Sequence, residues 1–479
     1  MSPILLIARD ELRLMARSRV AVVALLSLIA LSVVAIASSW AHQQRIADLR
    51  ARHQQAAADA FDAQPDRHPH RVVHYGHFIF RPLGPLAAFD PGVDAFTGNS
   101  MFLEGHRQNS ANFGDVRQSS LLVRFGQLSP AFVLQAVAPL LLVFLGFAAV
   151  ARERERGTLR LLLLQGVGRG TLIGGKLLAL GIVALAPALP ALVGLAAIAE
   201  RPGAAPAPIV VIAAGYLIYL ALWSVLILAV SALVGRARDA LLALVALWAV
   251  TTILVPRIAP DLAASAHGLR NRLQTDVAIA RDLRRLGDSH NPDDPHFAAF
   301  KAATLRRYGV DRVEDLPVNY KGLLALEGER LTAALFDRYA DESFGIQSRQ
   351  NAIVAAAGAA SPAIALRSLS MAAAGTDLSG HRRFLDQAER YRYALVQRLN
   401  RMQAEGVAYA DDTATDAGAD RRKRVDAGNW RAMPDFAFVP PEPAALARAA
   451  LPGLAVLLVW LAAAAGLLTI AARRLGMRR

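Results

Sequence analysis

Histidines are the residues of this sequence best suited to binding chemistry, and five of them fall within one short stretch. They are His68, His70, His74, His77 and His106. Imidazole nitrogens bind zinc and copper, so the stretch raises a metal-site hypothesis. The spacing matches no compact ligand motif, however, and no methionine or cysteine cluster accompanies it. We therefore expect solvated or hydrogen-bonded histidines, assign no metal ligands, and keep metal binding as an alternative.

A second reactive-looking segment is the charged, leucine-rich loop at residues 152–171. Two glutamates alternate there with three arginines, and Gly157 and Thr158 then restart a helix that carries a run of leucines at 161–164. A short helix with one charged end and an apolar body is suited to the membrane surface. The pattern therefore predicts an interfacial helix rather than a plain polar turn.

The same region contains a G-x-x-x-x-G-K string from Gly170 to Lys176. A phosphate-binding loop needs Ser or Thr next, to hold Mg²⁺, and a strand before it. This sequence has Leu177 at that position and no preceding strand, so we exclude nucleotide binding by this chain. No catalytic motif such as G-x-S-x-G or H-E-x-x-H is present either, so we do not expect an enzyme.

The elements that must position these residues are membrane spans. Hydrophobic residues make up 54% of the 479 residues and gather in long runs, and a bilayer core needs about 20 apolar residues per helix. The sequence therefore predicts an all-α polytopic membrane protein with six transmembrane helices. The predicted spans are residues 20–40, 130–151, 172–199, 208–234, 240–256 and 449–472.

The basic residues predict the orientation of these spans. The net charge is +14, but residues 257–448 carry 27 Lys or Arg against 25 Asp or Glu, and residues 41–128 carry 9 against 8. The excess lies in the interfacial stretch 1–19, the loop 152–171, the turn between spans four and five and the tail 473–479. By the positive-inside rule both termini are cytoplasmic, and no nucleic-acid partner is expected.

Two long segments, 41–129 and 257–448, then lie in the periplasm. The first should continue span one as a polar helix to residue 62 and then form an irregular, smaller mixed region with short strands. The second should be a mostly helical domain with its own core. Within it, residues 352–366 are apolar but too short for a span, which predicts a buried or interfacial helix. Residues 408–427 have few large apolar side chains, which predicts a loop.

These pieces together resemble the permease subunit of ATP-binding-cassette (ABC) exporters. The resemblance rests on the N-terminal ARDELRLMARSR and on ERERGTLRLLLLQGVGRGTLIGGK after the second span. It implies two copies of a separate ABC ATPase, which bind ATP and Mg²⁺, and a second permease, identical or homologous. This chain would hold no cofactor. The residues implied to face the ATPase are Glu153, Glu155, Arg156, Gly157, Thr158 and Leu159.

A narrower resemblance is to permeases related to the gliding-motility and multicopper-enzyme-maturation exporters. The segments AFDPGVDAFTG, LEGHRQN and SLSMAAAGTDLSGHRRFLDQAERYR are similar to a branch with enlarged periplasmic loops. The long first loop departs from the usual exporter permease. The candidate periplasmic functional residues are His74, His77, Asp90, Gly92, Glu104 and His106.

The sequence therefore predicts an exporter permease in the bacterial inner membrane, in contact with membrane lipids, ABC ATPases and a periplasmic partner. Two alternatives belong to other classes. One is a membrane-anchored periplasmic binding or sensor protein, against which stands the absence of a cytoplasmic output domain. The other is a periplasmic metal-delivery component, for copper, that uses the histidines between 68 and 106.

Overall fold

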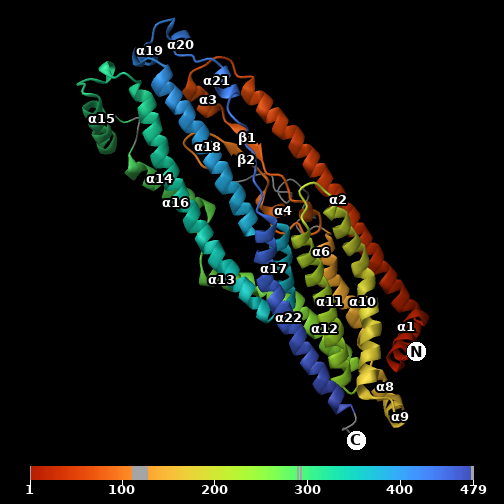
Figure 1. Ribbon diagram of the computed structural model, residues 1–479. Helices are drawn as coiled ribbons and strands as arrows, with labels where there is room; N and C mark the ends of the chain where they lie inside the picture. Colours follow the sequence, from red (N-terminus) through yellow and green to blue (C-terminus); the bar gives the residue numbers. More distant parts are fainter. Residues whose placement is uncertain (1, 110–127, 288–290, 292–293, 476–479) are drawn as a thin grey trace.

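A computed structural model describes residues 2–109, 128–287, 291 and 294–475. Most of these residues are helical, and the molecule is long in one direction (Figure 1). Both termini lie at one end of a helix bundle, together with the short helices α8 and α9. We call this the terminal end. The segments between spans one and two and between spans five and six extend together from the other end, and we call them the distal domain.

Six helices among the described residues are long and apolar enough to cross a membrane, which confirms the predicted class of fold. They are α2 (Arg19–Asp62), the run Pro130–Glu155, α10 (Arg169–Ala199), α11 (Pro206–Leu233), the run Ala237–Ala266 and α22 (Pro443–Arg474). The second span consists of α6 (Pro130–Phe132), η3 (Val133–Val137), α7 (Ala138–Gly146) and α8 (Ala151–Glu155). The fifth consists of α12 (Ala237–Trp248), η4 (Ala249–Leu254) and α13 (Val255–Ala266), and so extends beyond the predicted 240–256. The central helix is α11, which packs against α7, α10 and α22.

The helix of the first span continues well past the predicted span 20–40. Helix α2 has 44 residues and runs unbroken to Asp62, which at 1.5 Å per residue is a rod of about 66 Å. The predicted polar continuation of span one is therefore confirmed. Before it, α1 (Pro3–Arg17) packs against α10, and the two helices α1 and α2 are separated only at Ser18, whose side chain caps α2.

The distal domain is built from both inter-span segments. The first contributes α3 (Pro69–Tyr75), η1 (Pro85–Ala88), α4 (Asp94–Thr97) and an antiparallel pair, β1 (His77–Phe80) with β2 (Ser100–Leu103), in which His77 faces Leu103. The second contributes α14 (Arg272–Leu286), α15 (Pro295–Tyr308), η5 (Val313–Asp315), α16 (Tyr320–Ala356), η6 (Ala357–Ala359), α17 (Pro362–Ala374), α18 (Leu378–Gly406), α19 (Tyr409–Thr413), α20 (Ala419–Arg422) and α21 (Gly428–Arg431).

These segments share their cores. One cluster joins Phe61, Val72 and Val73 to Leu399 and Trp430. A second joins the strands to α18 through Ile79, Met101, Leu103, Phe384 and Ala388. The sequence predicted a core within 257–448 alone. In the structure, α3 and β2 of the first segment cover one face of α18. The sequence does not show this contact, because the two segments are far apart along the chain.

The apolar stretch at 352–366 forms a turn that enters the bundle. Helix α16 descends from the distal domain, η6 reverses the chain, and α17 returns against α11 and α22 (Figure 1). The Gly358 carbonyl accepts a hydrogen bond from Trp460 Nε1 at 3.0 Å, about half-way along α22. Ser361 caps α17 and also donates to the carbonyl of Thr251 in span five. As predicted, none of the six candidate spans among the described residues includes this stretch. It is not a single buried helix, however: residues 361–366 are buried, whereas residues 352, 355, 356, 359 and 360 are exposed.

The region 408–427 is more structured than the predicted loop. It forms α19 and α20, and Val425 pairs with Arg67 as an isolated bridge. Asp412 accepts hydrogen bonds from His68, Asn319 and Gln403 at 2.8–3.0 Å. Burial would raise the pKa of Asp412, but these three bonds outweigh burial and lower it. Hydrogen bonds to Asp412 thus hold the segment 408–427 in place. The prediction of a loop rested on the lack of large apolar side chains, which gives no information about such polar contacts.

Candidate functional site

The most distinctive local geometry at the terminal end is the turn between α8 and α9 (Thr158–Leu164). Gly157 adopts φ 75° between the two helices, a conformation that costs side-chain-bearing residues energy. No atom lies within 4 Å of where a Cβ would be, so the backbone conformation rather than space calls for glycine here. Thr158 Oγ1 then donates to the Glu153 carbonyl at 3.2 Å. The helix restart predicted at this glycine is present.

Helix α9 is anchored on one side and open on the other. Leu159 is only 5% exposed and packs in a core with Leu172 and Ile173 of α10. Leu161 and Leu164 are 59% and 74% exposed on the opposite side. The helix therefore presents an apolar surface outward at the end of the molecule, while Leu159 ties it to the third span.

Beneath this turn lies a buried cation between two carboxylates, which we call the lysine triad. Lys176 of α10 is 2% exposed and contacts Glu11 of α1 and Glu153 of α8, the latter at 2.7 Å. Three elements that are far apart in sequence meet at one ammonium group. Of the residues implied to face the ATPase, Glu153 thus points to Lys176 and Leu159 is buried, while Glu155, Arg156 and Thr158 are exposed.

Several basic residues of the terminal end hold helix ends in place. Arg154 donates to the carbonyls of Ala232 and Val234 at 2.7 and 2.9 Å, at the C-terminus of α11. Arg169 donates to the Arg473 carbonyl at 2.9 Å, at the C-terminus of α22. The positive charge of each arginine also interacts favourably with the negative end of the helix dipole. The positions of these arginines in the sequence predicted the orientation of the spans, but their spacing did not indicate these partners.

In the distal domain the structure brings three of the five histidines together. His70 and His74 lie one turn apart on α3, and their Nε2 atoms are 3.1 Å apart. His106, just after β2, lies with its ring centroid 5.7 and 5.3 Å from those two rings. One nitrogen from each of the three rings lies within 4.8 Å of the others. His70 belonged to the metal-site hypothesis but not to the candidate periplasmic residues, and Pro69 after His68 is a helix-start signal that could have placed His70 and His74 on one helix.

Behind His106 lies a second cation between two carboxylates, which we call the arginine triad. Arg392 is 1% exposed and contacts Glu329 at 2.7 Å and Glu389 at 2.6 Å. Glu329, fully buried, also accepts the backbone N–H of His106 at 3.0 Å and lies 3.3 Å from its Nδ1. Burial would raise the pKa of Glu329, but His106 and Arg392 together lower it to about 2. The carboxylate is therefore ionised and fixes the His106 ring.

The other predicted periplasmic residues do not join this cluster. His77 is buried between Phe61 and Tyr391, where burial lowers its pKa to about 4. Asp90 accepts the Gly92 N–H at 3.0 Å. At Gly92, with φ 52°, a Cβ would lie 2.3 Å from the Thr376 carbonyl, just after α17.

Glu104 lies closer to the arginine triad. Its carbonyl accepts from Arg392 at 3.2 Å, and its carboxylate accepts from Asn109. The six predicted residues thus separate into three places: the histidine cluster with the adjoining Glu104, the shared core, and the contact between the first segment and α17.

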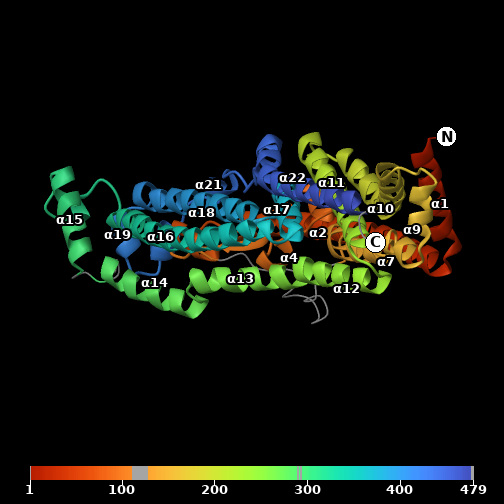
Figure 2. The same cartoon turned by 90° about the horizontal axis from the view of Figure 1, so that it is seen from below.

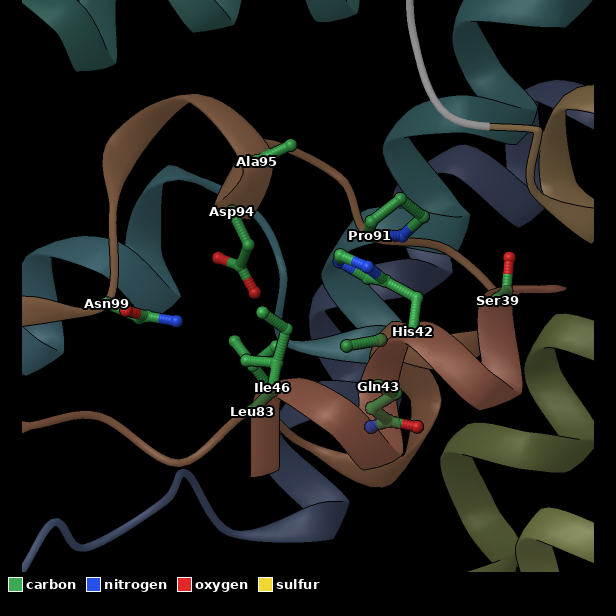
Figure 3. A pocket seen from close by; sticks show the side chains of 10 residues that line it. Ser39, His42, Gln43, Ile46, Leu83, Pro91, Asp94, Ala95 and Asn99 are labelled. Carbon is green, nitrogen blue, oxygen red and sulfur yellow. The ribbon is translucent and has the colours of Figure 1, made fainter. Parts of the chain in front are cut away.

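A small cavity opens where α2 leaves the bundle (Figure 3). His42 and Gln43 of α2 line it together with Pro91 and Asp94 from the loop opposite. Its volume is about 30 Å³, room for about one or two water molecules. Burial raises the pKa of Asp94, and the buried ion pair with Arg81 opposes that shift. The cavity is too small for a cargo molecule.

Comparison with known families decides the class of protein. The family described as "ABC-2 family transporter protein" matches residues 5–280, more than half of the chain. The chain belongs to the ABC-2 transporter family. A second family, "Domain of unknown function (DUF3526)", matches residues 272–439, which is most of the second segment of the distal domain. No curated protein matches the chain.

Membership of the ABC-2 family confirms the coarse predictions. The chain is a multi-pass membrane component of an ABC transporter. Members of the family are typically non-catalytic, and the family implies an ABC ATPase as partner. The match includes most of α1, the turn at Gly157 and all three members of the lysine triad. The narrower gliding-motility and multicopper branch stays a prediction.

Proposed function

We propose that this ABC-2 protein is the permease subunit of an exporter that moves a substrate outward with ATP hydrolysed by separate ATPase subunits. Two permeases, identical or homologous, would pair with two ATPases in the bacterial inner membrane. The terminal end would face the cytoplasm, and the distal domain the periplasm. ATP and Mg²⁺ would bind to the partner ATPase and not to this chain.

The observation that carries the proposal is the way α9 is joined to the bundle. Its exposed leucines, Leu161 and Leu164, offer an apolar docking surface, and its buried Leu159 contacts the core at α10. The lysine triad adds a polar connection from α8 to α1 and α10. A displacement of α9 by a closing ATPase would therefore reach α1 and the third span directly.

Pairing of two permeases is supported by the uneven burial of the spans. The most apolar stretch of α11 is 56% buried within this chain, whereas that of the fifth span is 11% buried. The fifth span runs along one edge of the molecule, where its α12 packs against α7 and α11 (Figure 2). Lipid and a second permease would cover these faces in the membrane.

Docking is tested with Leu164→Asp in the complex purified through a tag on this chain. A charge placed in an apolar interface costs at least about 1.4 kcal/mol, so we expect about ten-fold or greater loss of associated ATPase activity. The matched control is Leu273→Asp, at a leucine of α14 that is 72% exposed at the other end of the molecule. Equal ATPase activity in the two variants, with equal membrane insertion, would remove α9 as the docking site.

Sidedness is tested with single cysteines, because the chain has none of its own. In spheroplasts, a membrane-impermeant maleimide should label Leu273→Cys from outside. It should label Leu164→Cys only after the membrane is opened. The reverse pattern would contradict the proposed export geometry, even if the ATPase docks as described.

A further inference from the structure

The histidine cluster of the distal domain has the composition of a metal site. His70 and His74 stand at positions i and i+4 of α3, so their rings share one face of the helix. The segment after β2 brings His106 to the same place. Three imidazoles from two separate elements therefore converge on one point at the surface.

The separations match the coordination shell of a small divalent ion. Zinc–nitrogen bonds of 2.0–2.1 Å at tetrahedral angles place ligand nitrogens about 3.3 Å apart. The Nε2 atoms of His70 and His74 are 3.1 Å apart, and all three candidate nitrogens lie within 4.8 Å of one another. A movement of His106 toward the other two rings would place the three nitrogens at three corners of a coordination tetrahedron. Because His74 is exposed and the other two are partly buried, water can supply the fourth ligand.

The surroundings of His106 resemble the support that metal-binding histidines receive. Such histidines usually donate their second ring N–H to a carboxylate, which fixes the ring and leaves the other nitrogen for the ion. Nδ1 of His106 lies 3.3 Å from Glu329, which Arg392 holds in place. A proton on Nδ1 leaves the Nε2 lone pair available.

The backbone conformation of His106 is a second, independent indication of a functional site. Its φ of 63° is the only positive value at a non-glycine residue in the part of the chain that the structure describes. Such conformations are uncommon outside glycine and gather at functional sites. Here the backbone N–H of His106 is held by the same Glu329 that meets its ring.

We propose that His70, His74 and His106 bind one divalent transition-metal ion of the zinc class, with an open fourth position. Three neutral imidazoles suit Zn²⁺, Co²⁺, Ni²⁺ and Cu²⁺ and are poor ligands for Ca²⁺ or Mg²⁺, which need oxygen. The ion would join α3 to the end of β2 and, through Glu329, to α16 and α18. It would thereby clamp the two segments of the distal domain. The proposal does not depend on the direction of transport.

The test uses the full-length protein in detergent, without a polyhistidine tag, after removal of metal by a chelator. Co²⁺ is titrated first, because tetrahedral cobalt gives a visible absorption band, and Zn²⁺ is then used to displace it. We expect one ion per chain. His74→Ala should weaken binding by about ten-fold or more, and this variant should fold because His74 is exposed.

The matched control is His296→Ala. His296 also contacts a carboxylate, Glu327 at 3.1 Å, but it lies on α15 outside the cluster. Its removal should leave the affinity unchanged. Equal Co²⁺ affinity in the wild type and in a His70→Ala/His74→Ala variant would overturn the proposal, as would an equal loss in His296→Ala.

The support from Glu329 is tested separately. Glu329→Gln keeps the shape of the side chain but removes the charge, so binding should weaken by about 10–100-fold while the cobalt spectrum keeps its form. An unchanged affinity would exclude Glu329 from the site. A spectrum typical of six oxygen ligands in the wild type would exclude the histidine site altogether.

Discussion

The two ends of the molecule each contain a buried cation between two carboxylates, and they use different cations. At the terminal end, Lys176 contacts Glu11 and Glu153. In the distal domain, Arg392 contacts Glu329 and Glu389. Both cations are almost completely buried, at 2% and 1% exposure. The same charge pattern thus joins separate helices in both regions.

The difference lies in the geometry of the contacts. Arg392 binds Glu389 through two parallel hydrogen bonds of 2.7 and 2.6 Å and donates also to the Glu104 carbonyl. A guanidinium fork fixes its partners in one arrangement, whereas an ammonium group is a point charge that tolerates changes of angle. The lysine triad can therefore tolerate changes of angle between its three helices, whereas the arginine triad holds its partners in one arrangement.

The largest expected effect comes from Arg392→Leu. It leaves Glu329, which is fully buried, without its counter-ion, and loss of one partner from a buried ion pair costs about 3–5 kcal/mol. We expect that decrease in the free energy of unfolding, measured by denaturant titration with circular dichroism. The control is Arg330→Leu, which removes an arginine from α16 at the position next to Glu329. Arg330 is 55% exposed, and Glu327 also contacts His296, so loss of the Arg330–Glu327 pair should cost less than about 1 kcal/mol.

A smaller decrease in stability is expected from Lys176→Met. The side chains of Glu11 and Glu153 are 14% and 22% exposed, so they keep some access to water. We expect a cost of about 1–3 kcal/mol, measured in the same way. Associated ATPase activity should fall much further in this variant than in Arg392→Leu. If Lys176→Met proves as destabilising as Arg392→Leu, the contrast between a movable and a rigid joint is wrong.

The smallest change in the free energy of unfolding at neutral pH is expected from His77→Phe. This variant tests how the stability of the distal domain depends on pH. Burial lowers the pKa of His77 to about 4 despite the nearby Asp435, whereas its usual value is 6.5. The folded state therefore holds a neutral ring, and its stability is complete above pH 6.5 and is lost as the pH falls from 6.5 to 4. A phenylalanine does not titrate and suits the neighbouring Phe61 and Tyr391 rings.

At pH 5 the His77→Phe variant should therefore be more stable than the wild type by about 1–2 kcal/mol, although the two are similar at pH 7. Urea unfolding at the two pH values measures this difference. His381, whose pKa burial also lowers to about 4, remains in both proteins and contributes equally. Parallel pH profiles for the two proteins would show that His77 does not titrate in the core.

Much of the fold could be predicted because its signals are local. A run of about 20 apolar residues determines a span without reference to any other segment, and all six predicted spans are helices. The turn before α9 was predictable for a similar reason. Gly157 lies between a charged run and a leucine run. The positive φ needed at this turn depends on the type of that one residue and not on distant segments.

The candidate sites were less predictable because their members are far apart in sequence. Glu11 and Lys176 are 165 residues apart, and His106 and Glu329 are 223 apart. The resemblance to exporter permeases implied that Glu153 faces the ATPase. Its buried contact with Lys176 depends on how α1, α8 and α10 pack.

What the sequence by itself determined is therefore the set of helices, their apolar lengths and the conformation of individual turns. Those properties depend on hydration of single segments and on backbone energies of a few neighbouring residues. Only the tertiary structure decided which charged and histidine side chains meet. A buried Lys176 or Arg392 is stable only when its carboxylates arrive from other helices, so its role is a property of the packed chain.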